Sequence, residues 1–196
     1  MNVIIASNNK NKIREFKKIF ENTSFNLKSM SEAGLDIDIE ENGNTFEENA
    51  IIKATTIAKM LNTYAIADDS GLVVDALNGE PGVRSARYAG DQHNDDDNNK
   101  KLMENMRGKE NRSARYVCAI CFSNPRGEYV TTTDCCEGKI VDEPKGFNGF
   151  GYDPYFYIEK FKRTMAEISL EEKNTISHRA KALDKMKEKY AEVVNN

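Results

Sequence analysis

Short apolar runs alternate with helical stripes in the N-terminal part of this chain. Val3–Ala6 is typical of a buried strand, and a polar stretch at 7–12 separates it from apolar positions at helical spacing around Phe16 and Phe20. A second strand is predicted near 26–30. The pattern therefore predicts a strand, a helix and another strand in succession.

The next helix carries a signal at its N-terminus. A turn-rich acidic loop at 40–44 leads to Thr45, and Glu48 lies three residues further on, which is the spacing of a capping box. An apolar stripe follows at Phe46, Ala50, Ala54, Ile57, Ala58 and Leu61. We therefore predict an amphipathic helix capped by Thr45.

The second half of the chain is richer in turn residues. A glycine turn is expected at Gly71. The acids at 95–97 are typical of the start of a helix, where negative charge interacts favourably with the helix dipole, and this interpretation is favoured over a metal-binding run. Two strands at 111–123 and 128–137 flank a hairpin signal, and a last helix is predicted over 177–194. Interspersed helices and strands indicate an α/β fold with a mixed sheet, in a single domain spanning 1–196.

Composition narrows the functional classes. The 196 residues include 28 Lys and Arg against 32 Asp and Glu, giving a net charge of −4 and a pI near 5.4. This balance argues against a dedicated nucleic-acid binder, which usually carries a basic stripe. The chain has no apolar run that approaches the roughly 20 residues of a membrane span. The apolar residues at 1–5 are not accompanied by the basic segment that a secretory signal would place before them. We expect a soluble cytoplasmic protein with neither nucleic acid nor membrane as a partner.

The four cysteines do not predict a disulfide framework or a metal site. Cys118 and Cys121 have C-x-x-C spacing, but they lie in a predicted strand and should point to opposite faces of it. Cys135 and Cys136 are adjacent and should also diverge. Structural thiols are the favoured interpretation, and zinc or redox chemistry is the alternative.

The adjacent acids Asp68 and Asp69 are the most informative pair in the chain. Two neighbouring carboxylates at the end of a probable strand are costly without a positive partner. Mg²⁺, held by one or two carboxylates and substrate phosphate, is the usual partner, whereas a strand-end loop with solvated acids is the alternative.

Two other segments offer groups that suit a triphosphate. The loop Ser7–Lys12 joins a strand to a helix start, where backbone N–H groups and the helix dipole favour an anion, although an ordinary polar loop would look the same. Asn49 and Lys53 lie four apart, off the apolar stripe of their helix. Lys53 could reach phosphate or simply be solvated.

Two further segments offer groups that suit a purine base. In the segment 146–154, glycines permit close backbone approach and Phe150 and Tyr152 offer flat faces, with a plain aromatic turn as the alternative. His178 and Arg179 open the last predicted helix near Lys173. Such donors suit the 6-oxo group of a purine and pair badly with the amino group of adenine.

Six motifs in order are similar to one family. They are Ser7-x-Asn9-x-x-Lys12, Thr45-Phe46-x-Glu48-Asn49-Ala50-x-x-Lys53-Ala54, Ala67-Asp68-Asp69-Ser70-Gly71, Pro81-Gly82-x-x-Ser85-Ala86-Arg87-Tyr88, Gly149-Phe150-Gly151-Tyr152-Asp153-Pro154 and Ser177-His178-Arg179. The chain resembles the inosine/xanthosine triphosphate pyrophosphatases from about Val3 to Leu183. The phosphate loop departs from the family pattern with Asn8 and Asn11, where glycine is frequent, and Arg84 stands where Tyr or His is familiar.

The resemblance implies an elongated mixed sheet with flanking helices, two lobes around a central cleft, and a homodimer. It implies hydrolysis of ITP, dITP and XTP to the monophosphate and pyrophosphate with Mg²⁺ as the cofactor and Mn²⁺ as the alternative. Asp69 would be the catalytic base, and the metal would bind to Asp69 and to Glu41, or to Glu40 if the register differs by one. Substrate binding would fall to Ser7, Asn9, Lys12, Lys53, Ser70, Phe150, Gly151, Tyr152, Asp153, Lys173, His178 and Arg179.

Three other functions remain open at this point. A Maf-type pyrophosphatase would prefer pyrimidine or modified nucleotides, a sensor would bind ITP without cleaving it, and a general metal phosphatase would release orthophosphate first. Asp68 has no fixed role and would orient lysines or support the metal from outside its ligand shell.

Overall fold

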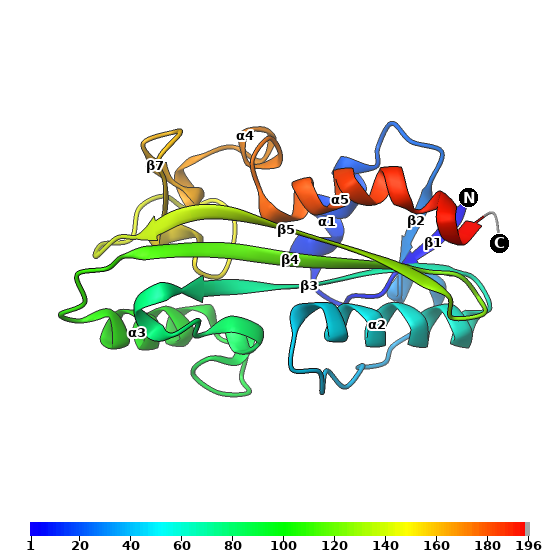
Figure 1. Ribbon diagram of the computed structural model, residues 1–196, viewed down its shortest axis with the longest axis horizontal. Coiled ribbons are helices and arrows are strands. Elements are labelled where there is room, and N and C mark those ends of the chain that lie inside the picture. The colour runs from blue at the N-terminus through cyan, green and yellow to red at the C-terminus, as the bar shows by residue number, and fades with distance from the viewer. Residues whose placement is uncertain (195–196) are drawn as a thin grey trace. The chain divides into compact units, whose positions relative to one another are not determined.

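The computed structural model describes residues 1–194 and contains a single mixed sheet within them (Figure 1). The strands are β1 (Asn2–Ile5), β2 (Asn26–Ser29), β3 (Tyr64–Val74), β4 (Ser113–Ser123), β5 (Tyr129–Ile140), β6 (Phe156–Ile158) and β7 (Arg163–Thr164). The α-helices are α1 (Lys10–Ile19), α2 (Phe46–Leu61), α3 (Asp95–Met106), α4 (Leu170–Asn174), α5 (His178–Lys189) and α6 (Ala191–Val194). The strand order is β2-β1-β3-β4-β5-β6-β7, with β1 parallel to β2 and β3, and β6 antiparallel to β5 and β7. The predicted α/β fold with a mixed sheet is confirmed.

The described chain divides into two compact units. The first unit comprises Met1–Asp69, Cys118–Asp134 and the chain from Arg179 onward; the second comprises Ser70–Val117 and Cys135–His178. The long strands β3, β4 and β5 therefore contribute residues to both units. A single domain over 1–196 and a two-lobed shape with a central cleft stay predictions.

The first unit has an apolar layer on each face of its part of the sheet. Helices α1 and α5 cover one face and α2 covers the other (Figure 1). Cys118 packs in the cluster that contains Phe16 and Leu183, whereas Cys121 packs in the cluster that contains Ala54. The two thiols therefore point to opposite faces of β4, as predicted, and all four cysteines are thiols outside any disulfide.

Helix α2 begins as the sequence predicts. Its N-cap is Thr45, whose hydroxyl accepts a hydrogen bond from the backbone N–H of Glu48 at 3.1 Å, and the Glu48 carboxylate accepts from the backbone N–H of Thr45 at 3.3 Å. Two of the unpaired N–H groups at the start of the helix are thus satisfied.

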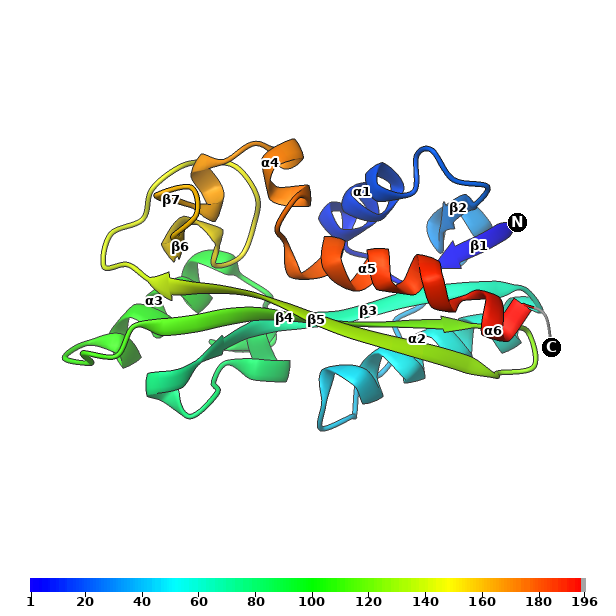
Figure 2. The same cartoon turned by 45° about the horizontal axis from the view of Figure 1, so that its top comes forward.

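The second unit packs around one cluster that includes Leu102 and Met106 of α3, Tyr116 of β4 and Phe156 of β6. Helix α3 lies on one side of β4 and β5, and β6, β7 and α4 lie on the other (Figures 1 and 2). Asn94 caps α3 by accepting from the backbone N–H of Asp97 at 3.1 Å, which confirms the acidic run as a helix start.

Two predicted elements differ from the structure. The last helix, predicted over 177–194, is interrupted at Tyr190, where the N–H of Val193 bonds the carbonyl of Tyr190 in a tighter turn at 3.1 Å. The ring of Tyr190 packs edge-on against Phe25 with centroids 4.7 Å apart, so tertiary packing fixes this break.

The glycine turn predicted at Gly71 is also wrong, because β3 continues without interruption through Val74. A Cβ at Gly71 would lie 2.3 Å from the Ser85 hydroxyl and 2.5 Å from the carbonyl oxygen of Gly82. The glycine is therefore required by the close approach of the 82–85 segment and not by a turn.

No helix among residues 1–194 is both long enough and apolar enough to span a membrane.

Candidate active site

Asp68 and Asp69 lie on β3 and are both buried, with 1% and 6% of their surface exposed. Successive side chains of a strand point to opposite faces, and the two carboxylates accordingly have different sets of direct contacts. The alternative of solvated acids in a strand-end loop is wrong. Each carboxylate instead has positive partners, as the cost of burying a charge requires.

The Asp68 carboxylate binds two cations of the first unit. Lys12 Nζ lies 3.1 Å from Oδ2, and the Arg179 guanidinium donates to the same oxygen from Nη2 at 2.9 Å and from Nε at 3.2 Å. Nη1 of Arg179 donates to the buried carboxylate of Glu15. Burial alone would raise the pKa of Asp68, but the charges of Lys12 and Arg179 outweigh it and hold that pKa well below its usual range. Asp68 is therefore a permanent anion that orients a lysine, in line with one of its two predicted roles.

The Asp69 carboxylate contacts α2. Asn49 Nδ2 donates to Oδ2 at 3.0 Å, and Lys53 Nζ lies 3.4 Å from Oδ1 and 3.0 Å from Oε1 of Glu41. Burial raises the pKa of Asp69, and the nearby Glu41 carboxylate adds to the rise, although Lys53 and Lys12 oppose it. Asp69 is thus the carboxylate of the pair that binds a proton more tightly than an ordinary aspartate, as suits a general base.

Lys53 is buried, so its alternative as a solvated lysine is wrong. The sequence places Asn49 beside Lys53 on one side of the helix but does not give it a role in the site. Its side chain has two functions, because Oδ1 also accepts the backbone N–H of Gly43 at 2.9 Å and so anchors the loop that carries Glu41. The i, i+4 spacing of the two polar residues, off the apolar stripe, was the available signal.

The chemistry of these donors fits a hard divalent cation. Glu41 and Asp69 both approach the ammonium of Lys53, so two carboxylates converge on one positive charge. Within residues 1–194, no group of three or more His, Cys, Asp or Glu side chains is arranged to hold a metal ion. Mg²⁺ commonly uses only one or two carboxylates and completes its shell with water and substrate phosphate, so the pair is sufficient.

The loop before α1 uses its short polar side chains locally. Asn9 caps the helix by accepting from the backbone N–H groups of Asn11 at 3.0 Å and Lys12 at 3.2 Å, and the Ser7 hydroxyl accepts from the backbone N–H of Asn9 at 3.2 Å. Asn8 Nδ2 donates to the carbonyl of Ile37 at 2.9 Å. The loop is therefore ordered by its own side chains at the positive end of a helix dipole.

A second group of predicted residues gathers in the second unit. Asp153 Oδ2 accepts from Lys173 Nζ at 2.8 Å and from the backbone N–H of Phe150 at 3.1 Å. The Lys173 ammonium also lies 5.0 Å from the centre of the Phe150 ring. A positive φ of 77° at Gly149 and of 63° at Gly151 allows the tight path of this segment. These contacts join Lys173, Asp153 and Phe150 into one network, so the segment is more than a plain aromatic turn.

The remaining predicted residues have varied positions. The Tyr152 hydroxyl is committed to the carbonyl of Ser85 at 2.7 Å, and the backbone N–H of Gly151 donates to Asp95 at 2.8 Å. Ser70 is half-buried and directly follows Asp69 on β3. His178 begins α5 and stacks on Tyr116 with ring centroids 4.9 Å apart. Tyr116 was not predicted as a site residue, because no local motif includes it.

Arg179 and His178 are adjacent in sequence but have different partners. His178 belongs to the second unit and Arg179 to the first, where its guanidinium is 1% exposed and bound to Asp68 and Glu15. Direct binding of nucleotide by Arg179 stays a prediction, and its observed contacts are those of a residue that positions Asp68.

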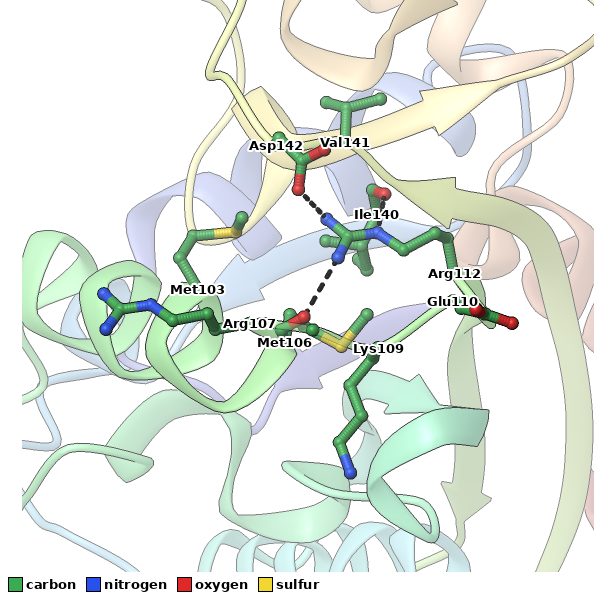
Figure 3. Close-up of a pocket in the computed structure, with 10 residues that line it drawn as sticks. Met103, Met106, Arg107, Lys109, Glu110, Arg112, Ile140, Val141 and Asp142 are labelled. Carbon is green, nitrogen blue, oxygen red and sulfur yellow. Dashed lines mark hydrogen bonds and ion pairs between the residues drawn. The ribbon is translucent and has the colours of Figure 1, made fainter.

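A cavity of about 750 Å³ in the second unit is lined by none of the predicted site residues. Figure 3 shows Arg112 in this cavity directed toward Asp142, with an Nη2–Oδ1 distance of 2.5 Å. The same guanidinium donates to the carbonyls of Ile140 and Met106 at 2.9 and 3.2 Å. The Arg112 side chain therefore ties the end of α3 to the end of β5.

Comparison with known proteins adds independent evidence. Residues 3–189 match the model of the Ham1 family. A dITP/XTP pyrophosphatase of Bacillus licheniformis is 53% identical over 94% of this chain and 95% of its own length, and one of Bacillus subtilis is 50% identical over 93% of both.

Solved structures agree with these relatives. The Ham1 protein of Staphylococcus aureus is 47% identical, with a TM-score of 0.85 over 95% of this chain and 96% of its own. A HAM1 protein from Coxiella burnetii is 40% identical, with a TM-score of 0.89 over 98% of this chain and 99% of its own. The sequence match over nearly the whole chain and the shared fold lead to one conclusion: this chain belongs to the Ham1 family.

Proposed function

We propose that this chain hydrolyses the non-standard purine nucleoside triphosphates ITP, dITP and XTP to the monophosphate and pyrophosphate. The observation that carries the proposal is the arrangement around β3, where Asp68 holds Lys12 and Asp69 contacts Lys53 and Asn49. Relatives that are about half identical to this chain are named dITP/XTP pyrophosphatases, which supports the same substrates.

Lys12 and Lys53 supply the positive charge for the triphosphate. Release of pyrophosphate builds negative charge on the leaving oxygens, and phosphoryl transfer is catalysed mainly by positioning and by neutralising such charge. Lys12 is held by Asp68 and its side chain is 14% exposed, so its ammonium is oriented before substrate binds. The ordered loop with Ser7 and Asn9 places backbone N–H groups and a helix dipole at the same end of α1.

Asp69 is the group that we assign to accept the proton of the attacking water. Its raised pKa makes it a stronger base than an exposed aspartate, which suits proton transfer at neutral pH. Asn49 donates to one of its oxygens and so limits the rotation of the carboxylate. In this proposal the water attacks the α-phosphorus, so that its oxygen enters the monophosphate and pyrophosphate is the leaving group.

Glu41 and Asp69 would hold the Mg²⁺ ion, which when bound would neutralise phosphate charge and acidify a bound water. Mn²⁺ is a possible substitute, since it accepts the same oxygen ligands.

The residues of the second unit suit the purine base. Lys173 and His178 can donate to an oxygen on the six-membered ring, and Phe150 offers a flat apolar face next to the Lys173 charge. A donor opposite the 6-oxo group of hypoxanthine or xanthine would face the amino group of adenine, and the resulting unpaired donors would reject ATP. Ser70, Gly151, Tyr152 and Asp153 complete the base and sugar contacts in this proposal. A homodimer and a cytoplasmic location stay predictions.

A panel of nucleoside triphosphates, with and without Mg²⁺, tests the proposal. We expect ITP, dITP and XTP to be cleaved faster than ATP, with pyrophosphate as the first product and loss of activity on chelation. In ¹⁸O-labelled water the label should enter the monophosphate. Preference for TTP or UTP would instead indicate a Maf-type enzyme, orthophosphate a general phosphatase, and binding without cleavage a sensor.

A matched pair of lysine variants on α2 tests the triphosphate assignment. Lys53 is buried against Glu41 and Asp69, whereas Lys59 lies exposed near the end of the same helix. We expect Lys53→Met to lower ITP turnover on the order of 10²-fold, which is typical for loss of a preorganised charge. Lys59→Met should stay near wild type. Equal activity in the two variants would remove Lys53 from the mechanism.

A further inference from the structure

Tyr116 of β4 contacts the residues to which the proposed function assigns the base, although it lies in none of the motifs that predicted them. Its ring stacks on the imidazole of His178 with centroids 4.9 Å apart and an interplanar angle of 16°. On another side the ring meets Phe156, with centroids 4.5 Å apart at 51°. Tyr116 is 7% exposed, so both contacts are shielded from water.

The hydroxyl end of Tyr116 is associated with Asp153. Burial raises the pKa of Tyr116 well above its usual value, and the charge of Asp153 and a hydrogen bond to it raise the pKa further. A phenol that stays protonated can serve as a donor to the carboxylate. Asp153 also accepts from Lys173 at 2.8 Å and from the backbone N–H of Phe150 at 3.1 Å. Tyr116 therefore links the two groups of base-binding residues, one through its ring and the other through its hydroxyl.

We propose that Tyr116 is a positioning residue for base recognition, because its ring fixes the plane of the His178 imidazole. This inference rests on the proposed function, since it requires His178 to contact the purine. The torsion that rotates an imidazole about its Cβ–Cγ bond is broad, so the ring needs a neighbour to hold it in one orientation. An almost parallel aromatic ring restricts this rotation and keeps the direction of the N–H donor constant.

The consequence is selectivity for substrate. An aimed donor distinguishes a 6-oxo group from a 6-amino group, whereas a freely rotating one does not. The interaction free energy of a stacked aromatic pair corresponds to a change in binding affinity of about 2- to 12-fold. Loss of the stack should therefore weaken ITP binding within that range and leave the poor binding of ATP nearly unchanged.

Two substitutions at Tyr116 separate positioning from core packing. Tyr116→Phe keeps the ring, and Tyr116→Leu removes it. In Tyr116→Leu we expect the KM for ITP to rise about 3- to 10-fold with a smaller change in kcat. The ratio of kcat/KM for ITP to kcat/KM for ATP should fall by about the same factor. In Tyr116→Phe the ratio should remain close to wild type.

Leu102→Ala is the matched control, because Leu102 is fully buried in the same apolar cluster on α3. It should lower the melting temperature without narrowing the ITP-to-ATP ratio. If Tyr116 only fills the core, Tyr116→Leu and Leu102→Ala will behave alike, with an unchanged ratio, and the inference is overturned.

The wild-type protein gives a second measurement that does not depend on the folding of a variant. Adding ITP without metal should shift the imidazole resonances of His178 in the NMR spectrum, and an absence of any shift would overturn the inference. The wild-type preference for ITP over ATP is measured in the same kinetic assays as the variants. Its absence would refute the proposed function itself, whereas its presence with an unchanged ratio in Tyr116→Leu would refute only the role of Tyr116.

Discussion

Replacement of Arg179 by methionine separates two roles for this arginine, structural positioning and direct contact with nucleotide. The guanidinium is 1% exposed and donates to Asp68 at 2.9 and 3.2 Å as well as to Glu15. Methionine keeps an unbranched side chain of similar reach but removes the charge and all of these donors. Two buried carboxylates then lose a cation that now contacts them both.

The magnitude follows from the burial of all three groups. Removing one member of a buried ion pair typically costs about 3–5 kcal/mol, because the remaining charge stays desolvated. Asp68 keeps Lys12 at 3.1 Å, so part of its compensation survives. We therefore expect Arg179→Met to lower the free energy of unfolding by about 3 kcal/mol, at the lower end of this range. Adding Glu15→Gln should recover part of the loss, since it removes one of the two buried charges.

Urea denaturation at neutral pH measures this difference directly. Arg126→Met is the control, because Arg126 forms an ion pair with Glu128 in which the two side chains are 59% and 53% exposed. Exposed pairs contribute about 0–1 kcal/mol, so the control should unfold nearly as wild type does. A change below about 1 kcal/mol in Arg179→Met would refute the structural reasoning. Loss of ITP binding in such a stable variant would favour direct contact with nucleotide.

Three further predictions concern other parts of the molecule. Asp69→Asn should lower ITP turnover on the order of 10²-fold or more with an unchanged circular dichroism spectrum, and near-wild-type turnover would exclude this residue as the base. At pH 8 iodoacetamide should modify the half-buried Cys135 well before Cys118, because burial raises the pKa of the Cys118 thiol and keeps it protonated. Mass spectrometry of the native protein measures the order of modification, and modification of Cys118 first would contradict this reasoning. Gly71→Ala should destabilise the fold by about 1–3 kcal/mol, since the new Cβ would lie 2.3 Å from the Ser85 hydroxyl, and an unchanged melting temperature would contradict this packing.

Features with a local physical cause were predictable from the sequence. The capping box of Thr45 and Glu48 depends on residues three apart, and the opposite directions of Cys118 and Cys121 depend only on the strand period. The same holds for the acidic start of α3. Each of these predictions needs no knowledge of distant parts of the chain.

Features that depend on distant residues were missed or misread. Gly71 has the composition of a turn, but its reason is the approach of Ser85, which no window around Gly71 contains. Glu15 carries no motif signal, although it binds Arg179 from the other end of the chain. Tyr116 looks like an ordinary strand residue until His178 is placed against its ring. Motif order predicts the segments of the candidate site, but it does not indicate which side chains support them.

The pleat of β3 explains how two identical neighbours come to have different properties. Asp68 meets Lys12 and Arg179, and the attraction of these cations outweighs burial and lowers its pKa. Asp69 points the other way, where burial and Glu41 raise its pKa despite Lys53. One acid is therefore fixed as an anion that organises cations, and the other has a raised pKa, which suits a general base. Because the strand places them on opposite faces, neither carboxylate has to serve both purposes, and the cost of burying two adjacent charges is offset by two separate sets of partners.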